Sequence, residues 1–194
     1  MKKLSLVILL SLMYLGVFAQ IGINTEISYG FKLSNTDYSN VRIEFSPGYN
    51  LNNNMFLGLG AGYIYMLKEA DYFNMSKKNY NMGAIPLYAH IKYSPWGKYS
   101  NMPFISFKAG YVFINKNHEY TSDKINMSTK YNGSVYLSPT LGWNFNLNKN
   151  NISLGINYNL IGCRIKNSEK NNYIKDLKSN ENSSTIGVSV GFEF

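Results

Sequence analysis

Hydrophobic and polar positions alternate with a period of two in eight separate segments of this chain. The clearest is the last one, S-S-T-I-G-V-S-V-G-F-E-F, in which every second residue from Ile186 is apolar and the chain ends on Phe194. Because successive side chains of a strand point to opposite faces, each segment predicts a β-strand between two different environments. The predicted strands cover residues 21–33, 41–51, 55–65, 84–93, 105–113, 131–147, 152–160 and 183–194.

The volume of the side chains decides which face of these strands points inward. The apolar faces carry roughly forty large side chains, too many for the interior of an eight-stranded barrel, which only its own side chains fill. The opposite faces carry mainly Gly, Ser and Asn with a few charges. We therefore predict an outer face in contact with lipid. A soluble barrel of the lipocalin kind would need the reverse arrangement and would leave an aromatic surface in water.

The predicted connections alternate between long and short. The long ones cover residues 34–40, 68–80, 115–130 and 164–182, and the short ones cover residues 52–54, 94–102 and 148–151. Short turns at one end and long loops at the other are typical of a transmembrane barrel, with turns in the periplasm and loops outside. We expect both termini at the periplasmic end.

The N-terminus has the features of an export signal. Lys2 and Lys3 precede an apolar run of about 15 residues, and Val17-Phe18-Ala19 offers a cleavage site before Gln20. This predicts a cleaved signal peptide, residues 1–19, and one barrel domain, residues 20–194. An uncleaved anchor is the alternative, but the run is short for a membrane-spanning helix. After Gln20 no apolar run reaches that length, so any span must be made of strands.

Composition narrows the chemistry. The chain carries 15 % charged and 15 % aromatic residues and a net charge of +8. Cys163 is its single cysteine, so we expect no disulfide bond to stabilise the fold. His90 and His118 are the only histidines and show no metal-ligand spacing, so we expect no metal and no cofactor. The lysines of the long loops would lie near lipopolysaccharide phosphates, and we expect no nucleic-acid partner.

Five short motifs carry a resemblance to a known family. They are S-P-G-Y-N-L (46–51), L-G-L-G-A-G-Y (57–63), I-P-L-Y-A-H-I-K-Y (85–93), P-F-I-S-F-K-A-G-Y (103–111) and the terminal G-F-E-F. With them the chain resembles the small outer-membrane β-barrel family, often labelled porin-family or outer-membrane β-barrel-domain proteins. The resemblance implies an all-β, eight-stranded, antiparallel, up-and-down barrel in the bacterial outer membrane. It does not imply one function, since the family includes structural anchors, adhesins and complement-resistance factors.

Eight polar side chains fall on the inward register and are the candidate site of this protein. Charges inside a barrel are tolerated when they are paired, so we predict a polar network that fills and plugs the lumen. An ion pathway is the alternative, but eight strands leave no continuous aqueous channel between filled side chains. The eight residues are Glu26, Lys32, Arg42, Glu44, His90, Lys92, Lys108 and Glu193.

The last strand is predicted to close the barrel. Phe192 and Phe194 point toward lipid, and Glu193 between them points inward. A C-terminal aromatic residue on such a strand is the expected signal for the barrel-assembly machinery, which we therefore expect as a partner.

These features favour a structural or surface-interaction protein that is not a general diffusion pore and not an enzyme. Its expected partners are outer-membrane lipids and lipopolysaccharide, with a possible extracellular ligand bound through the loops. One alternative is a lipid-A-modifying enzyme, because His118 in the loop after the fifth strand has Glu119, Ser122 and Asp123 nearby. A narrow gated pore is another.

Overall fold

The structure is a computed structural model. It describes residues 20–34, 38–67, 69–70, 78–79, 81–96, 101–122, 125–147, 150–169 and 177–194. The predicted signal peptide, residues 1–19, lies outside these ranges. Among the described residues no helix is long and apolar enough to cross a membrane.

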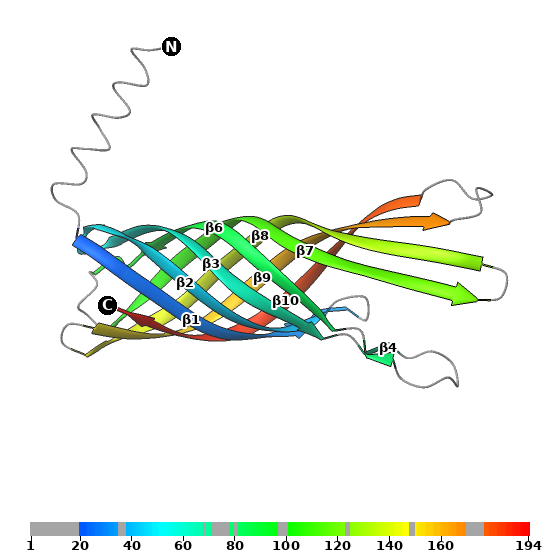
Figure 1. The fold of residues 1–194 in the computed structure, drawn as a ribbon. Coiled ribbons are helices and arrows are strands. Elements are labelled where there is room, and N and C mark those ends of the chain that lie inside the picture. Colours follow the sequence, from blue (N-terminus) through cyan, green and yellow to red (C-terminus); the bar gives the residue numbers. More distant parts are fainter. Residues whose placement is uncertain are drawn as a thin grey trace, which may run out of the picture.

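Eight strands close into one antiparallel barrel, and two short strands form a separate sheet (Figure 1). The order around the barrel is β1-β10-β9-β8-β7-β6-β3-β2, which confirms the predicted up-and-down topology. The barrel strands are β1 Gln20–Lys32, β2 Ser39–Asn52, β3 Met55–Leu67, β6 Met82–Tyr93, β7 Met102–Ser122, β8 Ile125–Leu147, β9 Asn150–Glu169 and β10 Leu177–Glu193. The short pair is β4 Glu69–Ala70 and β5 Lys78–Asn79, inside a predicted loop.

The first and last strands close the barrel. β1 pairs with β10 from Asn24↔Glu193 to Lys32↔Thr185, and the backbone N–H of Phe194 donates to the carbonyl of Ile23 at 3.0 Å. The C-terminus and the start of β1 lie at one end of the barrel (Figure 1). We call this end the termini end and the opposite end the loop end.

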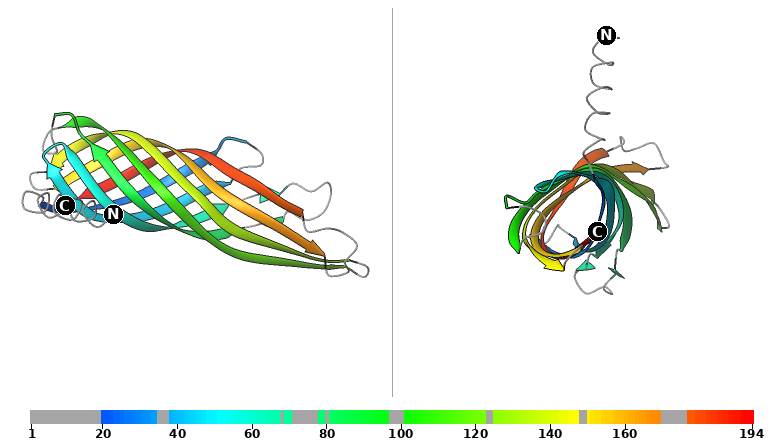
Figure 2. Two further views of the ribbon diagram at one scale, coloured as in Figure 1. Left: turned by 90° about the horizontal axis from the view of Figure 1, so that it is seen from above. Right: turned by 90° about the vertical axis from the view of Figure 1, so that its left-hand side faces the viewer.

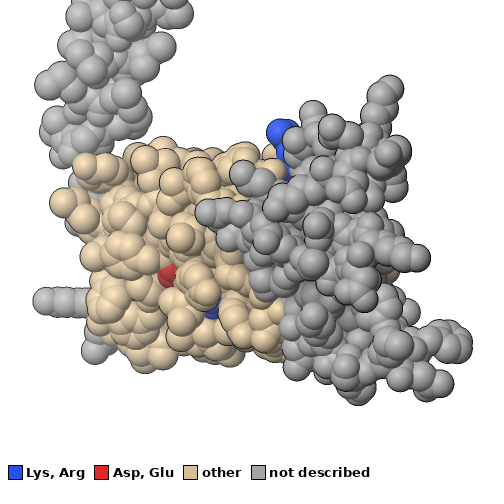
Figure 3. Space-filling model, turned by 45° about the vertical axis from the view of Figure 1, so that its right-hand side comes forward, with Lys and Arg blue, Asp and Glu red and all other residues tan. Residues whose placement is uncertain are grey.

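The two faces of the strands differ as the alternation predicts. Outward side chains are exposed and apolar: Leu59 is 73 % exposed, Ile156 64 % and Leu141 63 %. The described surface in Figure 3 accordingly shows almost no charged residue. Inward residues such as Ser138 and Asn159 are fully buried. The outer surface is therefore apolar, the reverse of a protein that folds in water.

Two of the predicted long loops are largely strand. Residues 115–130 were expected to connect two strands, but β7 continues to Ser122 and pairs through Ser122↔Ile125 with β8. Residues 164–182 contain the end of β9 and the start of β10. The sequence there is mostly polar, with only scattered apolar residues such as Ile125 and Met127, so no sustained apolar register marks the strands, while backbone pairing continues without it.

The longer strands form a wall on one side of the loop end (Figure 2). The β6–β7 ladder ends at Ala84↔Ile114 and the β1–β10 ladder at Lys32↔Thr185, whereas β7, β8, β9 and β10 remain paired with one another. We call this four-stranded continuation the extension; it comprises residues 115–122, 125–132, 164–169 and 177–184.

A β-bulge marks the transition from barrel to extension. The register between β7 and β8 shifts between Tyr111 and Asn115, and the register between β8 and β9 shifts next to Gly133. The Tyr111 hydroxyl donates to the Gly133 carbonyl at 2.6 Å. Since bulges bend a strand and increase its twist, this one separates the closed wall from the open sheet.

Candidate functional site in the barrel lumen

Five strands bring seven of the eight predicted residues into the lumen. Each lies on the inward register of its strand and is less than a tenth exposed. From β1, β2, β6, β7 and β10 come Glu26, Arg42, Glu44, His90, Lys92, Lys108 and Glu193. Lys32 does not join them, because it is exposed where β1 ends at the loop end.

Two carboxylates meet at the middle of the lumen. Glu26 and Glu44 are direct cross-strand neighbours on β1 and β2, an arrangement that is repulsive for like charges. Lys108 compensates for it from the opposite wall: its Nζ lies 2.8 Å from Glu44 Oε2 and 3.0 Å from Glu26 Oε2. One buried cation therefore joins both carboxylates and spans the barrel.

Arg42 of β2 connects these carboxylates to side chains of β8 and β9. Its Nη1 donates to the Tyr136 hydroxyl at 2.9 Å, and its Nη2 donates to Asn157 Oδ1 at 3.0 Å. It also donates to Asn159. The Tyr136 hydroxyl in turn donates to Glu44 Oε1 at 2.7 Å. We call Glu26, Arg42, Glu44, Lys108 and Tyr136 the central network.

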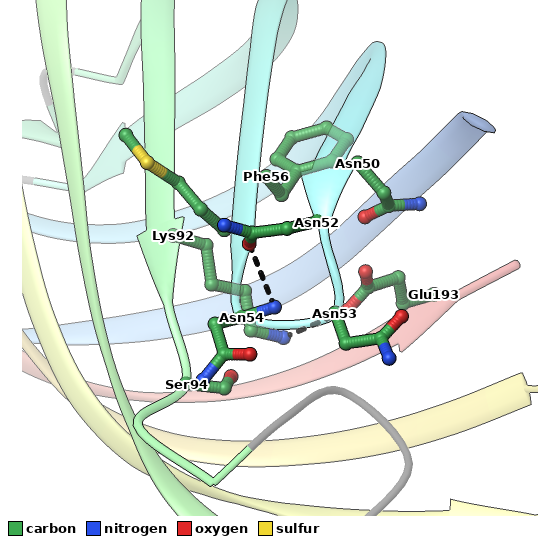
Figure 4. Close-up of a pocket in the computed structure, with 9 residues that line it drawn as sticks. Asn50, Asn52, Asn53, Asn54, Phe56, Lys92, Ser94 and Glu193 are labelled. Carbon is green, nitrogen blue, oxygen red and sulfur yellow. Dashed lines mark hydrogen bonds and ion pairs between the residues drawn. The ribbon is translucent and has the colours of Figure 1, made fainter. Parts of the chain in front are cut away.

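A second ion pair closes the lumen nearer the termini end. Lys92 Nζ lies 3.0 Å from Glu193 Oε2 and 4.3 Å from the centre of the Phe104 ring, so it is both ion-paired and stacked on an aromatic face. Around this pair lie asparagines of the β2–β3 turn, together with Ser94 (Figure 4). The space left among them is about 10 Å³, room for about one water molecule.

Aromatic side chains fill the lumen between the charged groups. Tyr88, Phe56 and Phe104 lie over inward glycines, where a Cβ at Gly60, Gly58 or Gly142 would collide with their rings. The glycines of the predicted strands thus have a packing role. Tyr88 also bonds to Ser46 at 3.1 Å between hydroxyl oxygens.

His90 lies between these rings and takes no part in the ion pairs. Its ring centre is 5.3 Å from that of Phe56 and 6.5 Å from that of Tyr88. Neither of its ring nitrogens has a hydrogen-bond partner among the described protein groups. His90 therefore lies on the predicted inward register, where its described contacts are with aromatic rings.

The loop half of the lumen is largely apolar, which the sequence analysis missed. We call this set of buried residues the apolar cluster. It comprises Tyr38, Ile64, Met66, Met82, Ala84, Tyr88, Val112, Ile114, Tyr136 and Ile161. The expectation that the inward face carries mainly Gly, Ser, Asn and charges is wrong here. The available signal was the loss of alternation: Tyr63 to Leu67 and Tyr111 to Ile114 are continuous apolar runs, as strands buried on both faces show.

The buried charges of the described lumen are equal in number and opposite in sign. Three buried carboxylates, on Glu26, Glu44 and Glu193, face three buried cations, on Arg42, Lys92 and Lys108. Within the described ranges no group of three or more His, Cys, Asp or Glu residues could hold a metal ion. The arrangement cross-links the strands across the barrel and fills this part of the lumen with side chains.

The residues that suggested a lipid-A-modifying enzyme lie in a strand and not in a loop. His118 was expected in a loop, but its backbone lies in β7, paired with Thr129 of β8. Glu119 and Ser122 follow on the same strand, and Asp123 lies outside the described residues. These residues belong to a strand because β7 continues through a mostly polar stretch of sequence.

Comparisons with known proteins agree with this architecture. A family model described as outer membrane protein beta-barrel domain matches residues 10–194. No curated protein matches the sequence significantly. Among solved structures, the outer membrane protein OprG from Pseudomonas aeruginosa aligns with a TM-score of 0.60 at 13 % identity, covering 91 % of this chain and 95 % of that one. The outer membrane protein AlkL in DMPC lipid bilayers aligns with a TM-score of 0.53 at 10 % identity, covering 90 % and 89 %. At these identities the likeness shows the fold alone.

Proposed function

Because the chain belongs to the outer membrane protein β-barrel domain family, we propose that it is a non-conducting membrane anchor that presents its extension as a contact surface. The observation that supports this most directly is the double closure of the lumen. The central network and the apolar cluster follow one another along the barrel axis, and each is built from side chains with almost no exposed area. Ions would have to displace both layers to pass.

The extension supplies the contact surface. Beyond Ile114 and Ser184, whose carbonyl still accepts from the Leu33 N–H at 3.3 Å, β7 and β10 pair with a barrel strand on one side only, as far as the described residues go. Such edges present unpaired backbone N–H and C=O groups, to which an extended polypeptide can add as a further strand. We place this end outside the cell and the termini in the periplasm, following the layout of outer-membrane barrels.

Conductance in planar bilayers tests the closed lumen. The purified barrel should give no stepwise current, whereas a general porin inserted in the same membrane gives one. A stable, ion-selective current would contradict the proposal, because it would require an open path through both layers.

The orientation can be tested by labelling cysteines on intact cells. In a Cys163→Ala background, Lys32→Cys at the loop end should react with a membrane-impermeant maleimide. Asn53→Cys, in the exposed turn between β2 and β3, should react only after the outer membrane is permeabilised. The opposite pattern would reverse our orientation.

We propose further that the protein does not modify lipid A. Mass spectra of lipid A from cells with and without the gene should be the same. The gain or loss of an acyl chain would overturn this and favour the enzyme. Lipopolysaccharide and the barrel-assembly machinery, acting on the C-terminal strand, remain proposed partners.

A contact role also predicts that the extension is dispensable for folding. Replacing residues 116–131, the β7–β8 part of the extension, by Asn-Gly joins the paired residues Asn115 and Asn132 and should leave the heat-modifiable migration of the barrel unchanged on a denaturing gel. Loss of the folded band would mean that the extension is part of the folding unit.

A further inference from the structure

A groove crosses the outer wall between the middle of the barrel and the termini end. It has a volume of about 400 Å³, within the range of about 300 to 1,000 Å³ typical of small-molecule sites. Its lining residues come from β1, β2, β9 and β10: Thr25, Glu26, Ile27, Ile43, Glu44, Phe45, Ile152, Val190, Gly191 and Phe192. We infer that this groove is a binding site for one acyl chain of a membrane phospholipid.

A small residue between two large ones accounts for the groove. Thr25 on β1 is the direct cross-strand neighbour of Phe45 on β2 and of Phe192 on β10. Two residues along β1, Ile27 lies between Ile43 and Val190. Thr25 thus forms a low floor, and the Phe45 and Phe192 side chains form walls on either side.

The groove offers a bound molecule an apolar lining. The Thr25 hydroxyl donates to the backbone carbonyl of Phe192 at 3.1 Å, so its hydrogen-bonding capacity is used within the wall. The carboxylates of Glu26 and Glu44 are buried in the lumen, where both contact Lys108, so these residues line the groove only with their backbone. A ligand with polar or charged groups would lose its hydration there without gaining partners.

The surroundings identify the occupant. The walls of the groove belong to the exposed apolar face, on which Ile27 and Ile43 are each 59 % exposed and Val190 is 55 % exposed. The hydrocarbon core of a bilayer contacts such a face, and its acyl chains are narrow and apolar. An acyl chain in the groove contacts the floor and both walls, whereas a chain on a flat part of the barrel contacts one surface. The bound chain therefore gains dispersion energy. A second protein molecule would instead need a broad complementary surface.

Native mass spectrometry of the full barrel tests this site. The protein is released from vesicles of palmitoyl-oleoyl phosphatidylethanolamine in mild detergent, and the fraction that retains one lipid is measured. Thr25→Phe should fill the floor between Phe45 and Phe192 and lower that fraction about tenfold, a loss equivalent to about 1.4 kcal/mol of binding free energy. The matched control is Ala89→Phe, which adds the same side chain to an exposed outward position on β6 and should retain lipid like the wild type.

A third variant separates shape from chemistry. Thr25→Val keeps the volume and removes the hydroxyl, so lipid retention should be unchanged, and heat-modifiable migration verifies that every variant is folded. The inference is overturned if Thr25→Phe retains lipid like the wild type, if Ala89→Phe loses it equally, or if Thr25→Val loses it. A dimer in place of the lipid adduct would overturn it too, because the groove would then be a subunit interface. None of these results depends on whether the lumen conducts.

Discussion

The two halves of the lumen are closed by different kinds of interaction. Near the middle and the termini end, buried ion pairs and hydrogen bonds join strands across the barrel, with Lys108 and Arg42 as the main links. Toward the loop end, the apolar cluster fills the space by packing. The ion pairs depend on each partner, because one removed charge leaves another buried and unpaired, whereas the cost of removing part of a packed side chain depends on the cavity that it leaves.

The largest effect is expected at the centre of the charged half. Glu44→Ala removes a shared partner of Lys108, Arg42 and Tyr136 and leaves the buried cations in excess, so it should cost about 3 to 5 kcal/mol of unfolding free energy. Urea unfolding of the barrel in lipid vesicles, followed by heat-modifiable migration, measures it. The control is Ser106→Ala, an equally buried position on β7. A loss below about 1 kcal/mol would mean that the central network stabilises the barrel no more than uncharged side chains of the same size would.

The apolar half should respond according to volume. Ile64 is fully buried in the apolar cluster, so Ile64→Ala should cost about 2 to 5 kcal/mol through lost contacts and a cavity. Ile64→Val should cost about 0.5 to 1.5 kcal/mol in the same urea unfolding measurement. Equal losses for Ala and Val would show that this half does not behave as a packed core.

The outer wall provides a reference for both halves. Leu59→Arg places a charge on the lipid-facing side of β3 and should cost about 2 to 4 kcal/mol in vesicles. Ser138→Ala, inside the lumen, should cost much less, about 1 kcal/mol. Its hydrogen-bond partners Arg42 and Asn159 keep other hydrogen bonds when the Ser138 hydroxyl is removed. Equal costs would reverse the assignment of inner and outer faces.

A smaller loss than that of Glu44→Ala is expected at the residue that belongs to both halves. Tyr136 packs in the apolar cluster and bonds to Glu44 and Arg42 through its hydroxyl. Tyr136→Phe keeps the ring and removes the hydroxyl, so it should cost about 1.5 to 3 kcal/mol, the range for a hydrogen bond to a charged group. In a Glu44→Ala background the same change should cost less, because the two residues share a network. Full additivity would show that the halves are independent.

Much of this fold could be predicted from single residues and their spacing. The alternation around Leu59 and Ile156 indicated both the strands and their outward face, and the inward positions of Glu26, Glu44 and Lys108 followed from the same register. The mostly polar stretches after Ile114 and before Thr185 could not be identified as strands, because their few apolar residues form no sustained alternation. Ile64, Val112 and Tyr136 were missed as lumen residues, since large apolar side chains in this sequence were mostly assigned to lipid.

The sequence by itself determined that this protein is a barrel with an apolar exterior, because a period of two and side-chain volume are properties of single strands. Only the tertiary structure decided which inward groups meet. Glu44 and Lys108 lie 64 positions apart, and Lys92 and Glu193 lie 101 apart. Strand tilt and stagger, which are fixed when the sheet closes, bring such pairs to the same level of the lumen. The same closure divided the interior into a charged half and an apolar half.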